Sequence, residues 1–264
     1  MLPAMEDENL RNLSRDELPQ SAAGKTIMTT EPKFIPKEAA SINLADGIEA
    51  KVRVIDCVGF MVDGAAGHVE NGEERLVKTP WFDYDIPFTQ AAEIGTRKVI
   101  NDHSTIGIVV TTDGTIGEIK RPGYIAAEKQ TIDELKKLGK PFVVLLNSTK
   151  PYSDETARLA REMSESYGVS VLPVNCEQLK KEDVFHILER VLKEFPVTEM
   201  DFHIPKWLEI LPSTHWLKAQ VIQAARNVIQ KVTHMKDVSG ELEQQHTDTI
   251  LSLIHISSPR DRSL

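Results

Sequence analysis

Apolar and polar positions alternate regularly in the middle of the chain. Three short runs are apolar almost throughout, and they cover Ser104–Thr111, Phe142–Asn147 and Val169–Val174. Each is followed by a segment with apolar residues every three or four positions, at Tyr124–Leu138, Asp154–Tyr167 and Lys181–Glu194. Apolar strands that alternate with amphipathic helices predict a mostly parallel sheet covered on both faces, which is a three-layer α/β sandwich.

An antiparallel hairpin is predicted ahead of this alternation. Two strand-like stretches, Ser41–Leu44 and Ala50–Ile55, flank the dipeptide Asp46-Gly47, which is typical of tight hairpin turns. The second stretch runs directly into Asp56, so the hairpin would deliver this carboxylate to the end of a strand.

Four further segments lie outside this pattern. Residues 63–90 form a long loop rich in glycine, proline and charge, which indicates either disorder or function, and Phe88–Ile100 predicts a helix. His215–Val238 has near-heptad apolar spacing and predicts one long helix, packed on this domain, on the next domain or on another copy of the chain. The tail at 251–264 continues no element and resembles translated adapter sequence, with a genuine flexible tail as the alternative.

Composition narrows the class of function. The chain has 264 residues, enough for one large domain and an appendage, and a formal net charge of -9. This acidic balance argues against a nucleic-acid partner, because a phosphate-binding face needs a basic excess. Cys57 and Cys176 lie in apolar runs, which favours reduced cytoplasmic thiols over a disulfide framework. We find no apolar run of about 18 residues and no secretory signal at Met1–Glu8, so membrane contact would be peripheral.

The most informative motif is Asp56-Cys57-Val58-Gly59, at the end of the apolar run 52–55. A strand that ends in Asp-x-x-Gly is typical of P-loop nucleotidases, in which the carboxylate holds a Mg²⁺-bound water and the glycine N–H approaches the γ-phosphate. Asp56 and Gly59 are therefore candidates for binding Mg²⁺ and nucleotide. An aspartate that only caps a strand before a turn is the alternative for Asp56.

A threonine pair, Thr29-Thr30, precedes this strand. Such a pair can sense the γ-phosphate from a switch loop, and either hydroxyl could ligate Mg²⁺. The sequence leaves open which of the two does so, and an ordinary polar loop is the alternative.

The phosphate cradle of a nucleotidase, a strand running into G-x-x-x-x-G-K-[ST], is not found in this sequence. The tripeptide Gly-Lys-Thr at 24–26 invites the comparison, but Pro19 stands where the first glycine should be and no apolar strand precedes it. We therefore interpret the chain as a P-loop domain whose first strand and helix are missing.

The segment Asn147-Ser148-Thr149-Lys150 occupies the base-recognition position, at the end of a predicted strand. Guanine-specific nucleotidases have Asn/Thr-Lys-x-Asp there, and the aspartate accepts two hydrogen bonds from guanine. Lys150 stands in place of that aspartate, and a cation accepts no hydrogen bond, so guanine specificity is unsupported. Asn147 and Lys150 are candidate nucleotide contacts, with a structural strand-end cap as the other interpretation of Asn147.

Two weaker patterns concern the rim of the site and metal binding. Asp113-Gly114, after the first apolar strand, is interpreted as a turn that could shape the rim of the site. The 8 histidines show no metal-ligand spacing with the cysteines, so no zinc site is expected.

These motifs are part of a longer resemblance that covers roughly residues 10–240. The chain resembles the stage IV sporulation protein A family of endospore-forming bacteria, whose members are coat morphogenetic ATPases. The matching segments are Asp16–Phe34, Val54–Gly59, Thr79–Trp81, Ala91–Ile100, His103–Gly107, Asp113–Gly117, Gly139–Phe142, Glu194–Val197 and His215–Leu217. A match of this extent is more specific than a shared nucleotide-binding motif.

The resemblance implies a translation-factor-like GTPase fold that has switched to ATP. It implies that ATP hydrolysis with Mg²⁺ drives polymerisation on the outer forespore membrane, from the mother-cell cytoplasm, into the base layer of the spore coat. A small amphipathic membrane peptide would recruit the protein, and other coat proteins would be partners. By position, Asp56 resembles the Walker B aspartate, and Thr29 and Thr30 resemble the sensor threonines.

The expected organisation is a truncated nucleotidase domain at 1–200, the helical start of a middle domain at 201–250 and a non-native tail at 251–264. The family's Walker A motif would lie ahead of Met1, and its remaining domains beyond about residue 240. We expect this chain alone to bind ATP poorly, to be inactive and to be marginally stable, because loss of a central strand exposes two strand edges. The alternatives are a GTPase switch and a nucleotide-independent scaffold.

Overall fold

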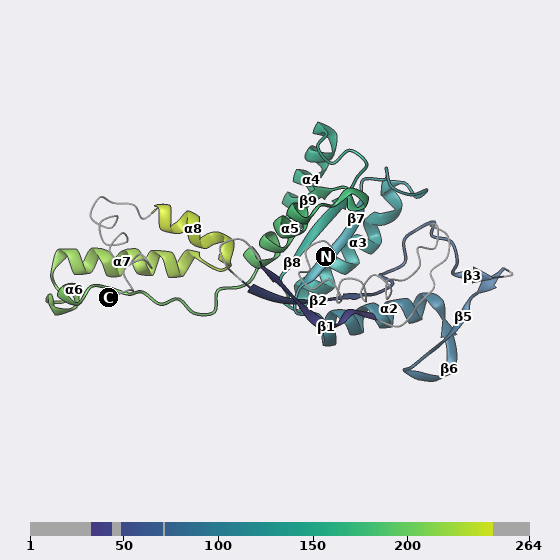
Figure 1. The fold of residues 1–264 in the computed structure, drawn as a ribbon, viewed down its shortest axis with the longest axis horizontal. Coiled ribbons are helices and arrows are strands. Elements are labelled where there is room, and N and C mark those ends of the chain that lie inside the picture. The colour runs from purple at the N-terminus through teal and green to yellow at the C-terminus, as the bar shows by residue number, and fades with distance from the viewer. Residues whose placement is uncertain (1–32, 44–48, 71, 245–264) are drawn as a thin grey trace. The chain divides into compact units, whose positions relative to one another are not determined.

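The computed structural model describes residues 33–43, 49–70 and 72–244 (Figure 1). The chain divides into two compact units, Met1–Val191 and Leu192–Leu264, and each is described by itself. The first unit is mixed α/β, and the described part of the second is mainly helical. The domain boundaries predicted at residues 200 and 250 stay predictions.

The centre of the first unit is a parallel sheet of three strands in the order β7-β8-β9. The strands are β7 (Gly107–Thr112), β8 (Phe142–Asn147) and β9 (Val171–Val174). The helices that follow them are α3 (Arg121–Lys137), α4 (Asp154–Tyr167) and α5 (Lys181–Lys193). The predicted alternation of parallel strands and helices is confirmed for this part of the chain, and Figure 1 shows it in teal and green.

Strand β8 lies in the middle of this sheet, and its residues from Phe142 to Leu146 are all buried. A strand buried on both faces must be apolar at every position, which explains its sequence FVVLL. Side chains from β7, α3 and α4 join it in the core, and they include Val109, Ile132, Leu135, Ala160 and Met163. The strand ends that carry polar residues therefore rest on a packed core.

The antiparallel hairpin consists of β1 (Lys33–Asn43) and β2 (Glu49–Asp56), as predicted. Its register pairs Lys33 with Asp56. Asp46-Gly47, the predicted turn, lies outside the described residues. Helix α5 packs against the hairpin through an apolar cluster of Ile42, Val52, Val184, Phe185 and Leu188.

The long polar loop predicted at 63–90 instead contains two small antiparallel ribbons. They are β3 (Val69–Glu70) with β4 (Glu73–Glu74), and β5 (Leu76–Thr79) with β6 (Phe82–Pro87). The predicted helix follows as α2 (Phe88–Lys98) and continues as one turn of π-helix, η3 (Val99–His103).

In the second unit the predicted single helix at 215–238 is wrong. The structure has α6 (Lys206–Ile210), α7 (Trp216–Lys231) and α8 (Met235–Gln244). The chain becomes extended at Val232, and a carboxylate oxygen of Asp237 accepts hydrogen bonds from the backbone N–H groups of Thr233 (3.1 Å) and His234 (2.8 Å). This local cap starts a new helix and outweighs the heptad-like spacing.

Candidate nucleotide-binding site

Asp56 is the last residue of β2, and its side chain is exposed at the strand end. The chain then turns through Gly59, whose φ of +84° lies in the left-handed region that favours glycine. Phe60 is buried and anchors the loop that follows. An exposed carboxylate on an anchored strand end is the arrangement predicted for a residue that holds a metal-bound water.

The thiol beside this carboxylate is a packing group. Burial raises the pKa of Cys57, and the neighbouring charge of Asp56 raises it further, while a hydrogen bond with the backbone of Gly59 offsets this only in part. Burial also raises the pKa of Cys176, and both cysteines are free. Thiols with raised pKa values are weak nucleophiles at neutral pH, so neither is a candidate for covalent chemistry.

The loop after Asp56 is tied to the first turn of α3. The backbone N–H of Asp63 donates to the carbonyl oxygen of Gly123 at 3.1 Å. A Cβ at position 123 would lie 2.7 Å from the Asp63 carbonyl oxygen, so glycine is required for this close approach. The start of α3 thereby restrains the segment that carries Asp56.

Asn147 joins the carboxyl ends of β8 and β9. Its side-chain oxygen accepts a hydrogen bond from the backbone N–H of Cys176 at 2.9 Å, where the short 3-10 helix η4 (Cys176–Gln178) begins. This contact supports the strand-end interpretation of Asn147. The side-chain nitrogen is the part of the amide that a nucleotide could contact.

Lys150 has a fixed backbone and an exposed side chain. Its N–H donates to the hydroxyl oxygen of Ser148 at 3.0 Å, and its carbonyl accepts from the Thr156 hydroxyl at 3.1 Å. Ser153 then caps α4, as predicted, by accepting from the Thr156 N–H. The loop from Asn147 to Lys150 is therefore built into the start of α4, and the side chain of Lys150 stays exposed.

A carboxylate that the sequence indicated only as part of a turn holds this loop from the other side. Asp113 Oδ1 accepts from the N–H (2.9 Å) and the hydroxyl (2.6 Å) of Thr115, and the same hydroxyl accepts from the N–H of Thr149 at 3.0 Å. Burial by itself would raise the pKa of Asp113, but hydrogen bonds from hydroxyl groups, those of Ser148 and Thr115 first, outweigh it and lower the pKa.

A second polar cluster beneath the strand ends was missed by sequence reasoning. Arg121 donates to both carboxylate oxygens of Glu128, and also to the hydroxyl of Thr111 and the carbonyl of Thr112 at the end of β7. Tyr167 donates to Glu128 at 2.7 Å, and burial followed by this hydrogen bond raises the pKa of Tyr167 to about 12. The available signal was a glutamate at a core-facing helical position, in register with Ile132 and Leu135.

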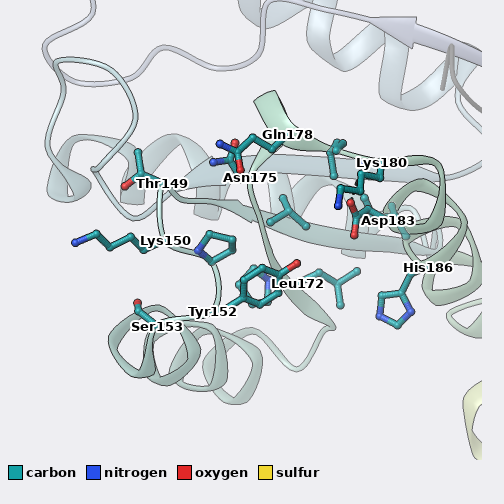
Figure 2. A pocket seen from close by; sticks show the side chains of 15 residues that line it. Thr149, Lys150, Tyr152, Ser153, Leu172, Asn175, Gln178, Lys180, Asp183 and His186 are labelled. Atoms are coloured by element: carbon teal, nitrogen blue, oxygen red, sulfur yellow. Dashed lines mark hydrogen bonds between the residues drawn. The ribbon is translucent and has the colours of Figure 1, made fainter.

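A cavity of about 640 Å³ lies beside the base-recognition loop and β9. Figure 2 shows Lys150 and Ser153 on the α4 side of this cavity and Lys180, Asp183 and His186 on the α5 side. Asp56 and Gly59 are not among the residues that line it. The structure thus places Asn147 and Lys150 on one loop and Asp56 and Gly59 on another, and of these four residues Lys150 lines this cavity.

The structure describes only some of the residues that were predicted to bind Mg²⁺. Thr29, Thr30 and the tripeptide at 24–26 lie outside the described residues. Within the described ranges no group of three or more His, Cys, Asp or Glu side chains could hold a metal ion. A Mg²⁺ ion held by one carboxylate together with phosphate oxygens needs no such group, so Asp56 fits that kind of site.

None of the helices in the described part of the chain is long and apolar enough to span a membrane.

Comparison with known proteins gives the family. The family model of the ATPase domain of stage IV sporulation protein A matches residues 1–196, and that of its middle domain matches residues 197–258. The chain is 46% identical to stage IV sporulation protein A of Bacillus subtilis (strain 168) over 244 residues, 92% of this chain and 50% of the relative. It is also 46% identical to that of Clostridioides difficile (strain 630) over 243 residues, again 92% and 50%.

The chain spans about half the length of the curated relatives it matches. The match to the ATPase domain nevertheless covers most of the chain, and the relatives align over 90% or more of it. The chain belongs to the stage IV sporulation protein A family, and it is a sporulation protein with an ATPase domain.

Proposed function

We propose that this chain carries the body of a P-loop ATPase with the topology of a translation-factor GTPase. The observation that supports this most strongly is the match of the ATPase-domain family over residues 1–196, in a chain whose β2 delivers Asp56 to an exposed strand end. The parallel order β7-β8-β9, with polar residues at the strand ends, is the arrangement in which α/β sheets bind ligands.

In this proposal the substrate is ATP with Mg²⁺. Asp56 orders a metal-bound water, the backbone N–H of Gly59 faces the γ-phosphate, and Thr29 or Thr30 ligates the metal from the switch loop. The metal ion, when bound, neutralises charge that develops on the transferred phosphoryl group. Asn147 and Lys150 lie on the side of the base.

Nucleotide preference follows from the residue at position 150. Lys150 cannot accept the two hydrogen bonds that guanine donates, so ATP is preferred over GTP. The hydrogen bonds that hold its backbone, to Ser148 and from Thr156, keep this lysine in the base-recognition loop. A GTPase switch is therefore the weaker alternative.

The biological role that we propose is assembly of the spore coat. Hydrolysis of ATP drives the protein to polymerise at the outer forespore membrane, on the mother-cell side, as the base layer of the coat. A small amphipathic membrane peptide recruits it, and other coat proteins join it. The relatives, which are named as stage IV sporulation proteins, support this proposal.

The test is Mg²⁺-dependent hydrolysis of ATP and GTP by the product of the complete reading frame. Asp56→Ala is expected to lower ATP turnover about 100-fold or more, because an ordered metal water is lost from the transition state. Asp63→Ala is the matched control, since Asp63 is exposed in the same loop and its tie to Gly123 uses only the backbone. Polymerisation that is indifferent to ATP and to Asp56→Ala would favour a nucleotide-independent scaffold.

A further inference from the structure

One hydroxyl group connects the base-recognition loop to the turn that follows β7. The backbone N–H of Thr149 donates to Thr115 Oγ1 at 3.0 Å, and this hydroxyl lies 2.6 Å from Asp113 Oδ1. An N–H can only donate and an ionised carboxylate can only accept, so the direction of both hydrogen bonds is fixed. The Thr115 oxygen accepts from Thr149 while its proton goes to Asp113. This chain of two hydrogen bonds, from Thr149 through Thr115 to Asp113, is the Thr115 bridge.

The carboxylate end of the bridge is firmly held. Asp113 directly follows β7, and its backbone N–H donates to the carbonyl oxygen of Asn147 at 3.4 Å. Its Oδ1 also accepts from the backbone N–H of Thr115 at 2.9 Å. The turn is packed against the start of α3, because a Cβ at Gly114 would lie 2.6 Å from the backbone nitrogen of Arg121. The bridge therefore starts from a fixed point at the end of β7.

The other end of the bridge holds the middle of the base-recognition loop. The N–H of Ser148 donates to the carbonyl oxygen of Val174 at 2.9 Å, within the sheet, and the N–H of Lys150 donates to the Ser148 hydroxyl at 3.0 Å. Thr149, between them, is tied to a different loop through Thr115. The bridge thus sets the position of the backbone one residue before Lys150.

The location of the bridge favours a role in binding over a role in folding. Thr115 is exposed and Asp113 is partly exposed, at the carboxyl ends of β7 and β8. Hydrogen bonds that are open to water contribute little net stability, because water competes for the same groups. The carboxyl ends of parallel strands are also where α/β sheets bind their ligands.

We propose that Asp113 and Thr115 are positioning residues for nucleotide selection, because the Thr115 bridge holds Lys150 at a fixed position relative to the base. The inference rests on the proposed function, since the loop recognises a base only if the protein binds a nucleotide. A fixed cation rejects guanine, which presents N–H donors where it needs an acceptor. Without the bridge, Lys150 can withdraw from guanine, and the loop must be ordered again whenever ATP binds.

The test compares Thr115→Val with Thr115→Ser in the product of the complete reading frame. Valine has nearly the shape of threonine but no hydroxyl, whereas serine keeps the hydroxyl. For Thr115→Val we expect the KM for Mg-ATP to rise about tenfold with kcat changed less than about twofold, because ground state and transition state lose the same binding. The preference for ATP over GTP, as a ratio of kcat/KM values, should fall at least about threefold. Thr115→Ser should keep both quantities within about twofold of wild type.

Two further variants show whether the effect belongs to the bridge. Thr131→Val makes the same exchange inside α3, where the Thr131 hydroxyl donates to the carbonyl oxygen of Ala127 at 2.8 Å, and it should leave KM and nucleotide preference unchanged. Asp113→Ala should raise the KM for Mg-ATP as Thr115→Val does. Because the two residues act as a unit, adding Thr115→Val to Asp113→Ala should change the KM by less than about twofold.

Hydrogen exchange resolved at single amides tests the bridge without nucleotide. Thr115→Val should speed exchange at the Thr149 amide, which loses its acceptor. Exchange at the Ser148 amide should stay unchanged, since that N–H donates to Val174. Circular dichroism and thermal unfolding check that each variant folds as the wild type does.

The outcomes separate the bridge from the function. Unchanged exchange at Thr149, faster exchange with wild-type KM and nucleotide preference, or equal losses in Thr115→Ser and Thr115→Val would overturn the positioning role. Hydrolysis of ATP by the wild type would still uphold the ATPase in each of these cases. Binding of Mg-ATP without hydrolysis would count against the ATPase alone, provided that Thr115→Val still raises the Kd about tenfold. A wild-type protein that binds no nucleotide would overturn both.

Discussion

Arg121 and Glu128 form a two-point ion pair, with Nη1 2.6 Å from Oε2 and Nη2 2.8 Å from Oε1. The side chain of Glu128 is only 1% exposed. Burial of a carboxylate is unfavourable unless its charge is matched, and here the guanidinium group also binds the end of β7. The pair therefore connects the stability of the core to the strand end that shapes the candidate site.

Removal of one partner of this ion pair should strongly destabilise the folded chain. Glu128→Ala leaves the partly buried guanidinium group of Arg121 without its carboxylate, and we expect the free energy of unfolding to fall by about 3–5 kcal/mol. The matched control is Glu162→Ala in the exposed pair with Arg158, for which a loss below about 1 kcal/mol is expected. Urea unfolding measures the loss of unfolding free energy in each variant, and similar losses would contradict a special role for Glu128.

The same carboxylate makes stability depend on acid pH. Burial alone would raise the pKa of Glu128, but hydrogen bonds, that of Arg121 first, and the charge of Arg121 outweigh it and lower the pKa. A folded pKa below the unfolded value means that the contribution is present above the unfolded pKa of about 4.3 and is lost as pH falls through the folded value. Unfolding free energy should fall below about pH 4, and Glu128→Gln should flatten that fall.

Gly123→Ala should lower stability, whereas alanine at a helical glycine with free space around it should not. Alanine normally favours a helix over glycine by about 1 kcal/mol. At position 123 the new Cβ would meet the Asp63 carbonyl, so Gly123→Ala is expected to destabilise the first unit by about 1–3 kcal/mol. Gly240→Ala, in α8 with nothing within 4 Å, should be neutral or stabilising. Thermal unfolding of the two variants compares the signs, and stabilisation by Gly123→Ala would contradict the close approach.

The side chain of Lys140 caps the C-terminal end of the π-helix η3. Its ammonium group donates to the carbonyl oxygens of Ile100, Asn101 (3.0 Å) and Ser104 (2.6 Å). Lys140→Met should lower the free energy of unfolding by about 1–3 kcal/mol, because these carbonyls lose a charged donor. Lys137→Met is the control, since the side chain of Lys137 is largely exposed, and equal effects in denaturant unfolding would remove Lys140 from this role.

Much of the parallel sheet was predictable because its signals are local. Strand β8 and helix α4 have the predicted bounds, Phe142–Asn147 and Asp154–Tyr167. An uninterrupted apolar run and a serine cap both act within a few residues, so no distant contact is needed to define them. The helix predicted at 215–238 failed for a related reason, since a local cap at Asp237 competed with the periodic pattern and ended it.

The candidate site was predictable only in part. Asp56 was expected at a strand end and is there, because the apolar run before it is a local signal. The tie from Thr115 to Thr149 was not expected, since the two residues lie on different loops and meet only when β7 pairs with β8. Thr29 and Thr30 stay predictions, as do the roles of Gly59, Asn147 and Lys150 in binding nucleotide.

The sequence by itself determined the three parallel strands, the helices that follow them, the family and the position of Asp56. Only the tertiary structure decided that Glu128 is buried against Arg121, that Gly123 holds the loop after Asp56 and that Thr115 joins the turn at Asp113 to Thr149. Periodicity and caps act between neighbours in the chain. Charge pairing, close backbone approach and burial depend on groups that folding brings together, so they follow from packing.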